Sequence, residues 1–446
     1  MTGVKQSPLR PIHYLGSKLR LLDFIQEAVD GIDPTGGVCD LFAGSGSVAY
    51  KLSQHHKVTA VDIQEYSRVL CSALLLKPEV KVTNTSEFIN ESRTLKHNEL
   101  LAWAMEPMIG YETLCTEMDI GGNPEPLCEL IEKGSIIAFE STQAREYSAG
   151  LLKAFTETVR RLHSSRELTD SSAIATRYFG GLYFSYAQAV DLDSLLYNIF
   201  RFEASARNIY LAAILSTASD VVNTVGKQFA QPIKPRNVDG TPKKNLGKML
   251  MKDRTIDTLG VFKQWLERYS SLKIYENKHV VYRKDYSEAL DLLDSDTKII
   301  YADPPYTRDH YSRFYHVLET LCLRDNPSVS TTLTGGVRSI SRGIYRENRH
   351  QSPFCIKSQA PDAFDTLFSK SRNLNATLLL SYSPYDESAN SHPRLLTIKE
   401  LKKIANRYYR HIEIVTPGGF SHSKLNSTNR HLPSSKVAEL LMICSV

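Results

Sequence analysis

The residues whose chemistry stands out are Asp303, Pro304, Pro305 and Tyr306, which follow the short strand candidate 298–301. The two prolines fix the backbone and remove two amide donors, so carbonyl oxygens are left free. The Asp303 carboxylate is a hydrogen-bond acceptor, and Tyr306 supplies an aromatic face. Together these residues predict a site that holds an amino group.

An exocyclic amine of a nucleobase suits such a site, because its lone pair is delocalised into the ring and needs help to react. Two acceptors for its N–H bonds, the Asp303 carboxylate and the Pro304 carbonyl, would favour a pyramidal nitrogen aimed at an electrophilic methyl group. The alternative is a proline-rich turn with a packed tyrosine. The strand before Asp303 and the glycine turn described next favour the catalytic interpretation.

The glycine turn comprises Asp40 to Gly46, after the short apolar run 38–42, and contains Phe42, Gly44 and Gly46. Glycines let the chain turn sharply and bring its backbone close to a ligand at the N-terminus of the next helix. The third glycine of the dinucleotide fingerprint is missing, which disfavours a nicotinamide cofactor. The turn is therefore a candidate binding site for another cofactor, or a plain strand-to-helix connection.

Asp62, followed by Ile63, lies at the end of the next strand candidate, 58–63. An acidic side chain at this position can accept hydrogen bonds from a ribose. An aspartate at a strand end is otherwise commonly a turn or helix cap, so the ligand interpretation depends on the glycine turn before it.

Strand candidates that alternate with helical patterns predict an α/β fold with a doubly wound sheet. Residues 38–63 form a β-α-β unit in which the helix begins at about Ser47. The other expected strands are 298–301, 376–383, 411–415 and 437–445, and the expected helices include 19–32 and a capping-box helix from Thr397 to about 410. The carboxyl ends of such strands form the edge where open α/β sheets bind ligands.

The expected sheet is interrupted by a long insertion. We expect a discontinuous catalytic domain, 1–75 and 280–446, and an inserted target-recognition domain, 76–279, that is mainly helical around 185–224. From Lys227 to Arg254 the insertion carries eight Lys or Arg against two Asp. These charges suit phosphate contacts or simply form a solvated loop, and the basic run 338–349 leaves the same two alternatives.

The composition is that of a globular chain of 446 residues with a formal charge of +5, which suits nucleic acid or metabolic partners equally. Seven cysteines without a CxxC pair indicate neither a disulfide framework nor a zinc site. His310 and His316 lack an accompanying carboxylate or Cys cluster, so no metal is expected. The absence of a long apolar stretch predicts no membrane segment and a cytoplasmic location.

In their order, these motifs resemble the N6-adenine DNA methyltransferases of the class that contains Dam. Residues 14–18 resemble the N-terminal W-A-G-G-K element of that family, which contacts the methyl donor, with Tyr14 in place of Trp and Ser17 in place of the second glycine. The resemblance implies a Rossmann-like methyltransferase fold with S-adenosylmethionine as cofactor. The cofactor-binding residues that it implies are Tyr14, Gly16, Lys18, Asp40, Phe42, Gly44, Gly46, Asp62, Ile63, Asp285 and Tyr286.

Within the family pattern, residues 283–286 resemble the G-D-F segment, which implies that Asp285 and Tyr286 hold the adenine of the cofactor. Residues 303–306 correspond to the catalytic motif. Near the end of the sequence, three further elements resemble the closing N, R and E-L-L positions of the family: Asn426, Arg430 and Glu439-Leu440-Leu441.

The function implied is methyl transfer to adenine N6 in double-stranded DNA, with the base extruded from the duplex and stacked on Tyr306. A restriction-modification role with a cognate endonuclease is the implied context. The alternatives are an RNA adenine methyltransferase, a cytosine N4 enzyme and a non-catalytic DNA-binding module. The aromatic and basic stretch 308–316 either lines the base pocket or packs in a core, because Tyr315, Leu318 and Cys322 have helical spacing.

Overall fold

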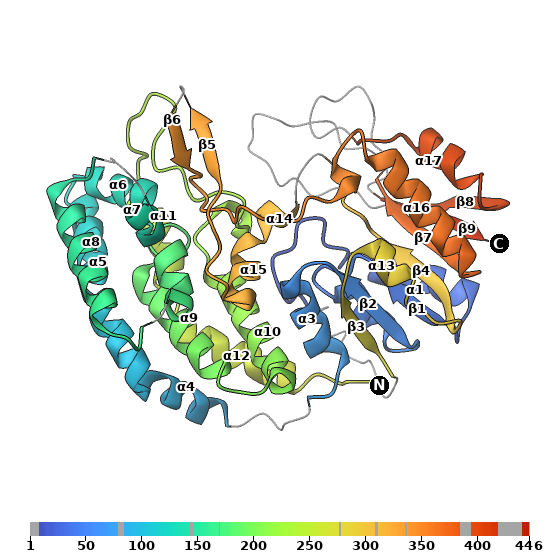
Figure 1. Ribbon diagram of the computed structural model, residues 1–446, viewed down its shortest axis with the longest axis horizontal. Helices are drawn as coiled ribbons and strands as arrows, with labels where there is room; N and C mark the ends of the chain where they lie inside the picture. Colours follow the sequence, from blue (N-terminus) through green and yellow to red (C-terminus); the bar gives the residue numbers. More distant parts are fainter. Residues whose placement is uncertain are drawn as a thin grey trace. The chain divides into compact units, whose positions relative to one another are not determined.

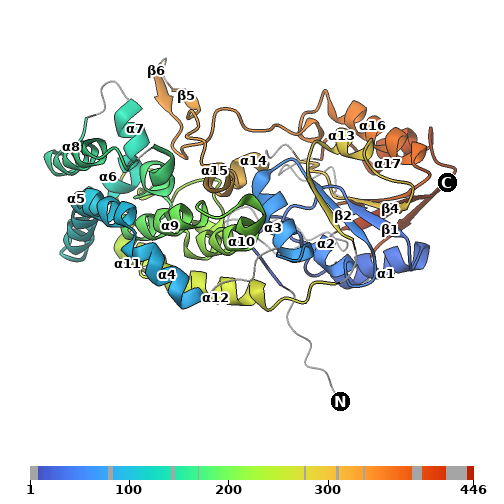
Figure 2. The same ribbon diagram turned by 60° about the horizontal axis from the view of Figure 1, so that its bottom comes forward.

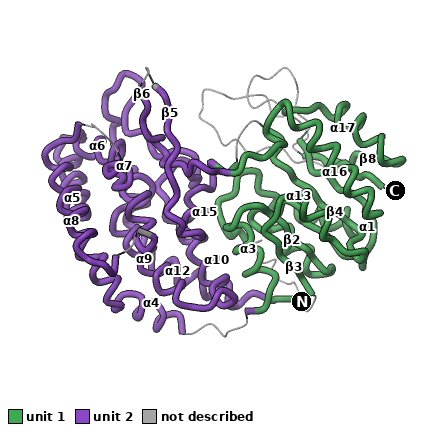
Figure 3. Tube along the Cα trace, viewed as in Figure 1, with its two compact units in different colours: residues 1–77, 273–312, 350–446 green, residues 78–272, 313–349 purple. Residues whose placement is uncertain are grey.

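A computed structural model (Figure 1) describes residues 9–78, 84–141, 146–168, 170–275, 278–307, 311–334, 337–383, 394–417 and 439–445. The chain forms two compact units (Figure 3). Unit 1 comprises Met1–Lys77, Lys273–Ser312 and His350–Val446, and unit 2 comprises Pro78–Leu272 and Arg313–Arg349.

Unit 1 is built on a seven-stranded sheet with the order β3-β2-β1-β4-β7-β9-β8. Its strands are β1 Gly37–Asp40, β2 Val58–Asp62, β3 Val280–Arg283, β4 Thr297–Ala302, β7 Thr377–Tyr382, β8 His411–Val415 and β9 Leu440–Ser445. The first five run parallel, and β9 pairs antiparallel with both β7 and β8. All the expected strands are present, whereas β3 was not expected.

Helices cover both faces of this sheet (Figure 2), which confirms the doubly wound α/β fold. One face carries α1 Leu22–Ile32, α2 Ser47–Leu52 and α3 Glu65–Leu75, and the other carries α13 Tyr286–Leu290, α16 Ala360–Asn373 and α17 Ile398–Ala405. The capping box of α17 is present, because Thr397 Oγ1 accepts from the Glu400 amide at 3.2 Å and Glu400 Oε2 accepts from the Thr397 amide at 2.7 Å.

The buried strands read as nearly continuous apolar runs because both faces are covered. On the side of α16, Phe364 and Phe368 pack in one apolar core with Ile300 of β4 and Leu378 of β7. This packing fixes the positions of the strand ends from which the candidate site residues project.

The strand order reverses between β1 and β4. From β1 the chain passes outward to β2 and β3, and then returns to the other side of β1 as β4. At such a switch point the loops leave adjacent parallel strands in opposite directions and open a crevice at the carboxyl ends. The glycine turn after β1 and the residues after β4 therefore border this crevice.

The described residues of unit 2 are mainly helical. The helices are α4 Thr85–Thr94, α5 Lys96–Ile120, α6 Glu125–Lys133, α7 Ile136–Ser141, α8 Ala149–Ser164, α9 Tyr186–Ile199, α10 Ala204–Val221, α11 Leu246–Arg254, α12 Thr258–Ser270 and α15 His316–Leu323. Its two strands, β5 Thr331–Thr334 and β6 Val337–Ile340, form an antiparallel hairpin. The short helix α14, Tyr311–Phe314, begins in unit 1 and ends in unit 2. Short 3-10 or π turns are Asp170–Ala173, Ala175–Phe179 and Val225–Lys227 in unit 2, and Pro353–Cys355 in unit 1.

The unit boundaries at 77 and 273 lie close to those expected at 75 and 280. Residues 313–349, which we expected in the catalytic domain, instead cluster with unit 2. The reason is a set of tertiary hydrogen bonds: the Phe229 amide donates to the Phe314 carbonyl at 3.2 Å, and the Tyr183 hydroxyl donates to the Gly343 carbonyl at 3.1 Å. The sequence placed residues 313–349 in the catalytic domain because they follow residues 303–306, and it gave no sign of these contacts.

Candidate active site

A cavity lies within unit 1 and is lined by residues that follow β1, β2 and β4. The expected site residues that line it are Tyr14, Lys18, Phe42, Asp62, Ile63, Asp285, Tyr286, Asp303, Pro304, Pro305 and Tyr306. The structure thus brings together, at the switch point, the residues expected to bind the cofactor and those expected to bind the target amine.

Four expected residues do not line the cavity: Gly16, Asp40, Gly44 and Gly46. The glycines have left-handed backbone angles, with φ of +53° at Gly44 and +74° at Gly46. A Cβ atom on Gly44 would lie 2.6 Å from the Tyr14 hydroxyl. Glycine is therefore needed at position 44 both for the backbone conformation and for the approach of Tyr14.

Asp40 lies beneath the turn and is only 1% exposed. Burial raises the pKa of Asp40 to about 8, and the nearby Asp303 charge adds to that rise. Its carboxyl group accepts a hydrogen bond from the Ala49 backbone in α2. Burial therefore favours the neutral form of Asp40, which connects β1 to the next helix and does not line the cavity.

Asp62 faces the cavity at the end of β2. Its Oδ2 accepts from the Gly44 amide at 3.0 Å, and its Oδ1 accepts from the Gln64 amide at 2.9 Å. Burial raises the pKa of Asp62, whereas these two backbone hydrogen bonds lower it. Each carboxylate oxygen has a further lone pair, so Asp62 can still accept hydrogen bonds from a ligand.

An aromatic wall stands beside Asp62. Tyr286 has its ring 5.9 Å from Phe42, stacked, and 4.9 Å from Phe354, edge-on. The preceding Asp285 caps α13 by accepting from the Ser287 amide at 2.9 Å. These contacts fix an apolar surface of the kind that binds a planar ring.

Asp303, directly after β4, forms an ion pair with Lys18. The two atoms Lys18 Nζ and Asp303 Oδ2 lie 2.8 Å apart, and Lys18 Nζ also lies 3.4 Å from Glu439 Oε1. Burial raises the pKa of Asp303 to about 6, while the Lys18 ammonium opposes that rise and the Glu439 carboxylate adds to it. The Lys18 ammonium therefore favours the ionised form of Asp303, in which both carboxylate oxygens can accept hydrogen bonds from an amine.

Tyr306 is held at several points. Its hydroxyl donates to Glu439 Oε1 at 3.0 Å, and its ring lies 4.7 Å from the ring of Tyr382. The guanidinium carbon of Arg394 lies 4.8 Å from its centroid. The aromatic face expected to receive a base thus belongs to a fixed side chain.

Several cavity residues were missed by the sequence analysis: Leu15, Leu41, Gln64, Tyr66, Lys284, His350, Ser352 and Pro353. Most of these residues lie next to a recognised motif in the sequence and could have been predicted from that position. Residues 350–353 are not, because a tertiary contact brings them close: the Cys355 thiol lies 3.6 Å from the Pro305 carbonyl. Burial lowers the pKa of His350, so the cavity contains a neutral imidazole at pH 7.

The aromatic stretch 308–316 divides between the two interpretations. Tyr311 and Ser312 line the cavity of unit 1. Tyr315, Leu318 and Cys322 are buried in unit 2, as core packing requires. Residues 308–310 lie outside the described residues, as do Asn426 and Arg430.

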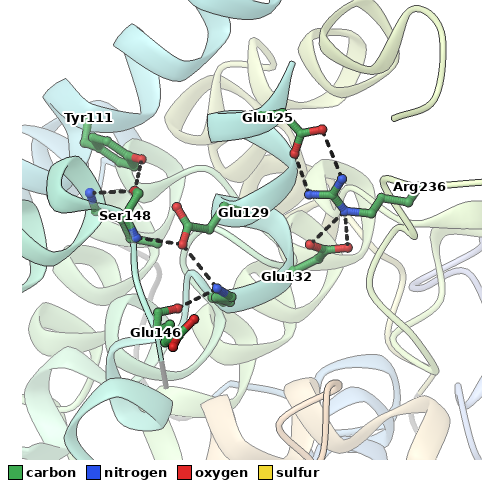
Figure 4. Close-up of polar contacts among 9 residues, drawn as sticks. Tyr111, Glu125, Glu129, Glu132, Glu146, Ser148 and Arg236 are labelled. Carbon is green, nitrogen blue, oxygen red and sulfur yellow. Dashed lines mark hydrogen bonds and ion pairs between the residues drawn. The ribbon is translucent and has the colours of Figure 1, made fainter. Parts of the chain in front are cut away.

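The basic segment 227–254 in unit 2 also divides into two sets. Three cations are paired internally: Lys227 with Asp253 at 2.6 Å, Arg254 with Glu112, and Arg236 with both Glu125 and Glu132 at 2.8 and 3.1 Å. Figure 4 shows the Arg236 guanidinium between its two glutamates. Five lysines have no ion-pair partner among the described residues: Lys234, Lys243, Lys244, Lys248 and Lys252.

In the second basic run, Arg346 pairs with Asp325 at 2.5 Å and Arg349 lies 5.2 Å from the Tyr345 ring centroid. The described part of the chain contains no group of three His, Cys, Asp or Glu residues arranged to hold a metal. None of its described helices has the length and apolar character needed to cross a membrane.

The sheet order and the cavity at its switch point define the fold of an S-adenosylmethionine-dependent methyltransferase. The model of the D12 class N6 adenine-specific DNA methyltransferases matches residues 14–103 and 260–372, which contain the glycine turn and residues 303–306. Over these two segments the chain is similar to this family, which confirms the resemblance inferred from its motifs.

Three curated relatives are modification methyltransferases. The chain is 23% identical to modification methylase LlaI of Lactococcus lactis subsp. lactis, over 89% of its own length and 49% of the relative. It is 24% identical to type II methyltransferase M.FokI of Planomicrobium okeanokoites, over 83% and 44%, and 24% identical to M.NlaIII of Neisseria lactamica, over 80% and 79%. The chain therefore spans about half the length of the first two relatives.

Proposed function

We propose that the chain transfers a methyl group from S-adenosylmethionine to N6 of adenine in double-stranded DNA, as the modification enzyme of a restriction-modification system. The observation that carries this proposal is the buried Lys18–Asp303 pair at the switch-point cavity, with Pro304 and Tyr306 beside it. The family match and the names of the modification methyltransferases support the same reaction and context.

The cavity fits the proposed cofactor in its chemistry. Asp62 retains acceptor capacity for ribose hydroxyls, and the Phe42–Tyr286 wall suits an adenine ring. Tyr14 and Lys18 lie on the same cavity. When bound there, S-adenosylmethionine supplies an electrophilic methyl group.

The amine of the target adenine would donate to the Asp303 carboxylate and the Pro304 carbonyl. Both acceptors are fixed by the strand end and the proline backbone, so little reorganisation is needed when the nitrogen becomes pyramidal. Tyr306 would stack on the extruded base, which offsets part of the few kcal/mol that extrusion costs. Transfer in line would form the N6–methyl bond as the S–methyl bond breaks, with release of S-adenosylhomocysteine and of one amine proton, and it would need no covalent bond between protein and base.

In segment 227–254, the five lysines that have no ion-pair partner among the described residues suit contacts with DNA phosphates. Lys244, Lys248 and Lys252 recur every four residues, and the last two lie on one side of α11. All three are exposed. Such contacts are independent of sequence and would position the duplex rather than choose its recognition site.

The test is methylation of mixed-sequence duplex DNA with labelled S-adenosylmethionine, followed by nucleoside mass analysis. We compare the wild type with Asp303→Ala and with the matched control Asp296→Ala, whose side chain is 75% exposed. The proposal expects N6-methyladenine from the wild type and the control only, with cofactor binding kept by all three.

Each other outcome has a distinct meaning. Turnover by Asp303→Ala would exclude the assigned role of that carboxylate. Product on RNA and none on duplex DNA would favour an RNA adenine methyltransferase, and N4-methylcytosine would identify a cytosine enzyme. A wild-type chain that fails to bind S-adenosylmethionine would be the non-catalytic module.

A further inference from the structure

Glu439 touches the site from outside the two segments that match the family model. It directly precedes β9 and is 6% exposed. Its Oε1 atom accepts from the Tyr306 hydroxyl and from Ser381 Oγ, each at 3.0 Å, and lies 3.4 Å from Lys18 Nζ. One buried oxygen therefore joins the residue expected to stack on the base to the cation that pairs with Asp303.

We propose that Glu439 is a positioning residue for the methylation step, which holds Tyr306 and Lys18 in their working geometry. This inference rests on the proposed function. Glu439 itself does not line the cavity, so its effect on the base and the methyl donor is indirect.

The first part of the role concerns the Tyr306 ring. The hydroxyl is the far end of the side chain, so a hydrogen bond there opposes a swing of the whole ring about its Cα–Cβ bond. Tyr382 and Arg394 contact the ring itself. A ring fixed before the base arrives loses less conformational freedom on stacking, and the base is held closer to the geometry that reacts.

The second part concerns the charge of Asp303. One ammonium, Lys18, lies between two carboxylates, at 2.8 Å from Asp303 and 3.4 Å from Glu439. Without Glu439 the ammonium would neutralise Asp303 alone and compete with the substrate amine for its lone pairs. Sharing the ammonium leaves Asp303 a stronger acceptor for the amine.

The backbone explains how Glu439 reaches the site. In the antiparallel pair of β7 and β9, Leu440 lies opposite Tyr382. Glu439 therefore stands beside the end of β7, where Ser381 donates to it. Its position depends on sheet pairing and not on a flexible loop contact.

The experiment measures kcat and both KM values for DNA methylation by Glu439→Ala. We expect kcat to fall by about a hundredfold, the usual effect of a misplacement near 1 Å, with the KM values and cofactor affinity nearly unchanged. The matched control is Glu413→Ala, at an exposed position on the neighbouring strand β8, which should behave like the wild type. The fold should tolerate Glu439→Ala, because Lys18 and Asp303 remain as a neutral pair.

A double-mutant cycle with Tyr306→Phe separates positioning from general destabilisation. Tyr306→Phe removes only the hydroxyl that Glu439 holds, so Glu439→Ala should cost much less kcat in that background than in the wild type. Equal losses in the two backgrounds would overturn the Tyr306 part of the inference, and an unchanged kcat for Glu439→Ala would overturn all of it.

A second variant protects the test against misfolding. Glu439→Gln keeps an acceptor oxygen for Tyr306 and Ser381 and loses the charge that attracts Lys18, so its kcat should lie between those of the wild type and Glu439→Ala. A Gln variant with the wild-type kcat and no coupling to Tyr306→Phe would also refute the role. Absence of N6-methyladenine from the wild type itself would instead refute the proposed function.

Discussion

Lys18 Nζ lies 2.8 Å from Asp303 Oδ2, so the N-terminal motif and the proposed catalytic motif meet in one buried ion pair. The family resemblance assigned Lys18 to the methyl donor. The structure places it on the cavity wall and against the carboxylate proposed to receive the amine. Because burial favours the neutral acid, the charge of Asp303 depends on this ammonium.

Lys18→Met tests this dependence through the pH profile of methylation. The wild-type kcat should fall as the pH is lowered through about 6, where Asp303 takes up a proton. Without the ammonium the pKa of Asp303 rises, so the acidic limb of the profile should move to higher pH. Measuring kcat from pH 5 to 9 checks this, with the melting temperature as a control for folding. An acidic limb that stays in place would show that Lys18 does not govern Asp303.

Asp40→Asn tests the neutral state of the buried Asp40. The folded-state pKa of about 8 lies above the usual aspartate value of 3.8, so the contribution of Asp40 to stability should be greatest below pH 4 and should be lost as the pH rises from 4 through 8. The amide cannot ionise, so the variant should gain melting temperature relative to the wild type, more at pH 8 than at pH 5. Calorimetry at both pH values measures the gain.

The same variant should keep its affinity for S-adenosylmethionine at pH 7, because a neutral carboxyl group is replaced by a neutral amide. Titration calorimetry with the cofactor provides the measurement. A clear loss of affinity in a well-folded Asp40→Asn would mean that an ionised Asp40 carboxylate binds the cofactor after all.

Gly44→Ala should weaken cofactor binding by displacing Tyr14, whose hydroxyl would lie 2.6 Å from the new Cβ atom. It also places a side chain on a left-handed residue, at a cost of about 1–2 kcal/mol of unfolding free energy. Gly226→Ala is the matched control, since its φ is +73° and nothing lies within 4 Å of the added atom. Denaturation and cofactor titration of both variants separate the clash from the backbone strain. Equal cofactor affinities would contradict the role of Gly44.

The triple variant Lys244→Gln, Lys248→Gln and Lys252→Gln should weaken DNA binding and flatten its salt dependence. Each lost phosphate contact should reduce the slope of log K against log salt by about 0.9. The control replaces three lysines of unit 1, in α17: Lys399, Lys402 and Lys403. Fluorescence anisotropy with duplex DNA at several salt concentrations measures the slope. A slope unchanged in the α11 variant would assign these lysines to a solvated surface.

The sequence predicts the ligand edge of unit 1 well, because its signals are local. Asp62 and Asp303 each follow a short apolar run, and parallel strands bring such ends together. Gly44 and Gly46 likewise mark a turn, because glycine readily adopts the left-handed backbone angles that the turn requires. For these elements, the type of residue and its position relative to a strand are enough to predict that it lies at the ligand edge.

Contacts between distant segments were not predictable in this way. Arg236 belongs to a segment that the sequence predicts to be a basic loop. Its charge is in fact neutralised by Glu125 and Glu132 of α6. The assignment of 313–349 to unit 2 and the hydrogen bond from Tyr306 to Glu439 depend equally on tertiary packing. Secondary-structure propensity and hydrophobic periodicity do not indicate which side chains from distant parts of the sequence will form a hydrogen bond or an ion pair.

The place of β9 between β7 and β8 has a consequence for how the protein is made. On the ribosome, β7 and β8 are synthesised first and must leave room for a strand that emerges later. Glu439 arrives with that strand, whereas Lys18 and Tyr306 are already present in the nascent chain. The hydrogen bond that Glu439 accepts from Tyr306 can therefore form only after β9 has been synthesised and inserted between β7 and β8.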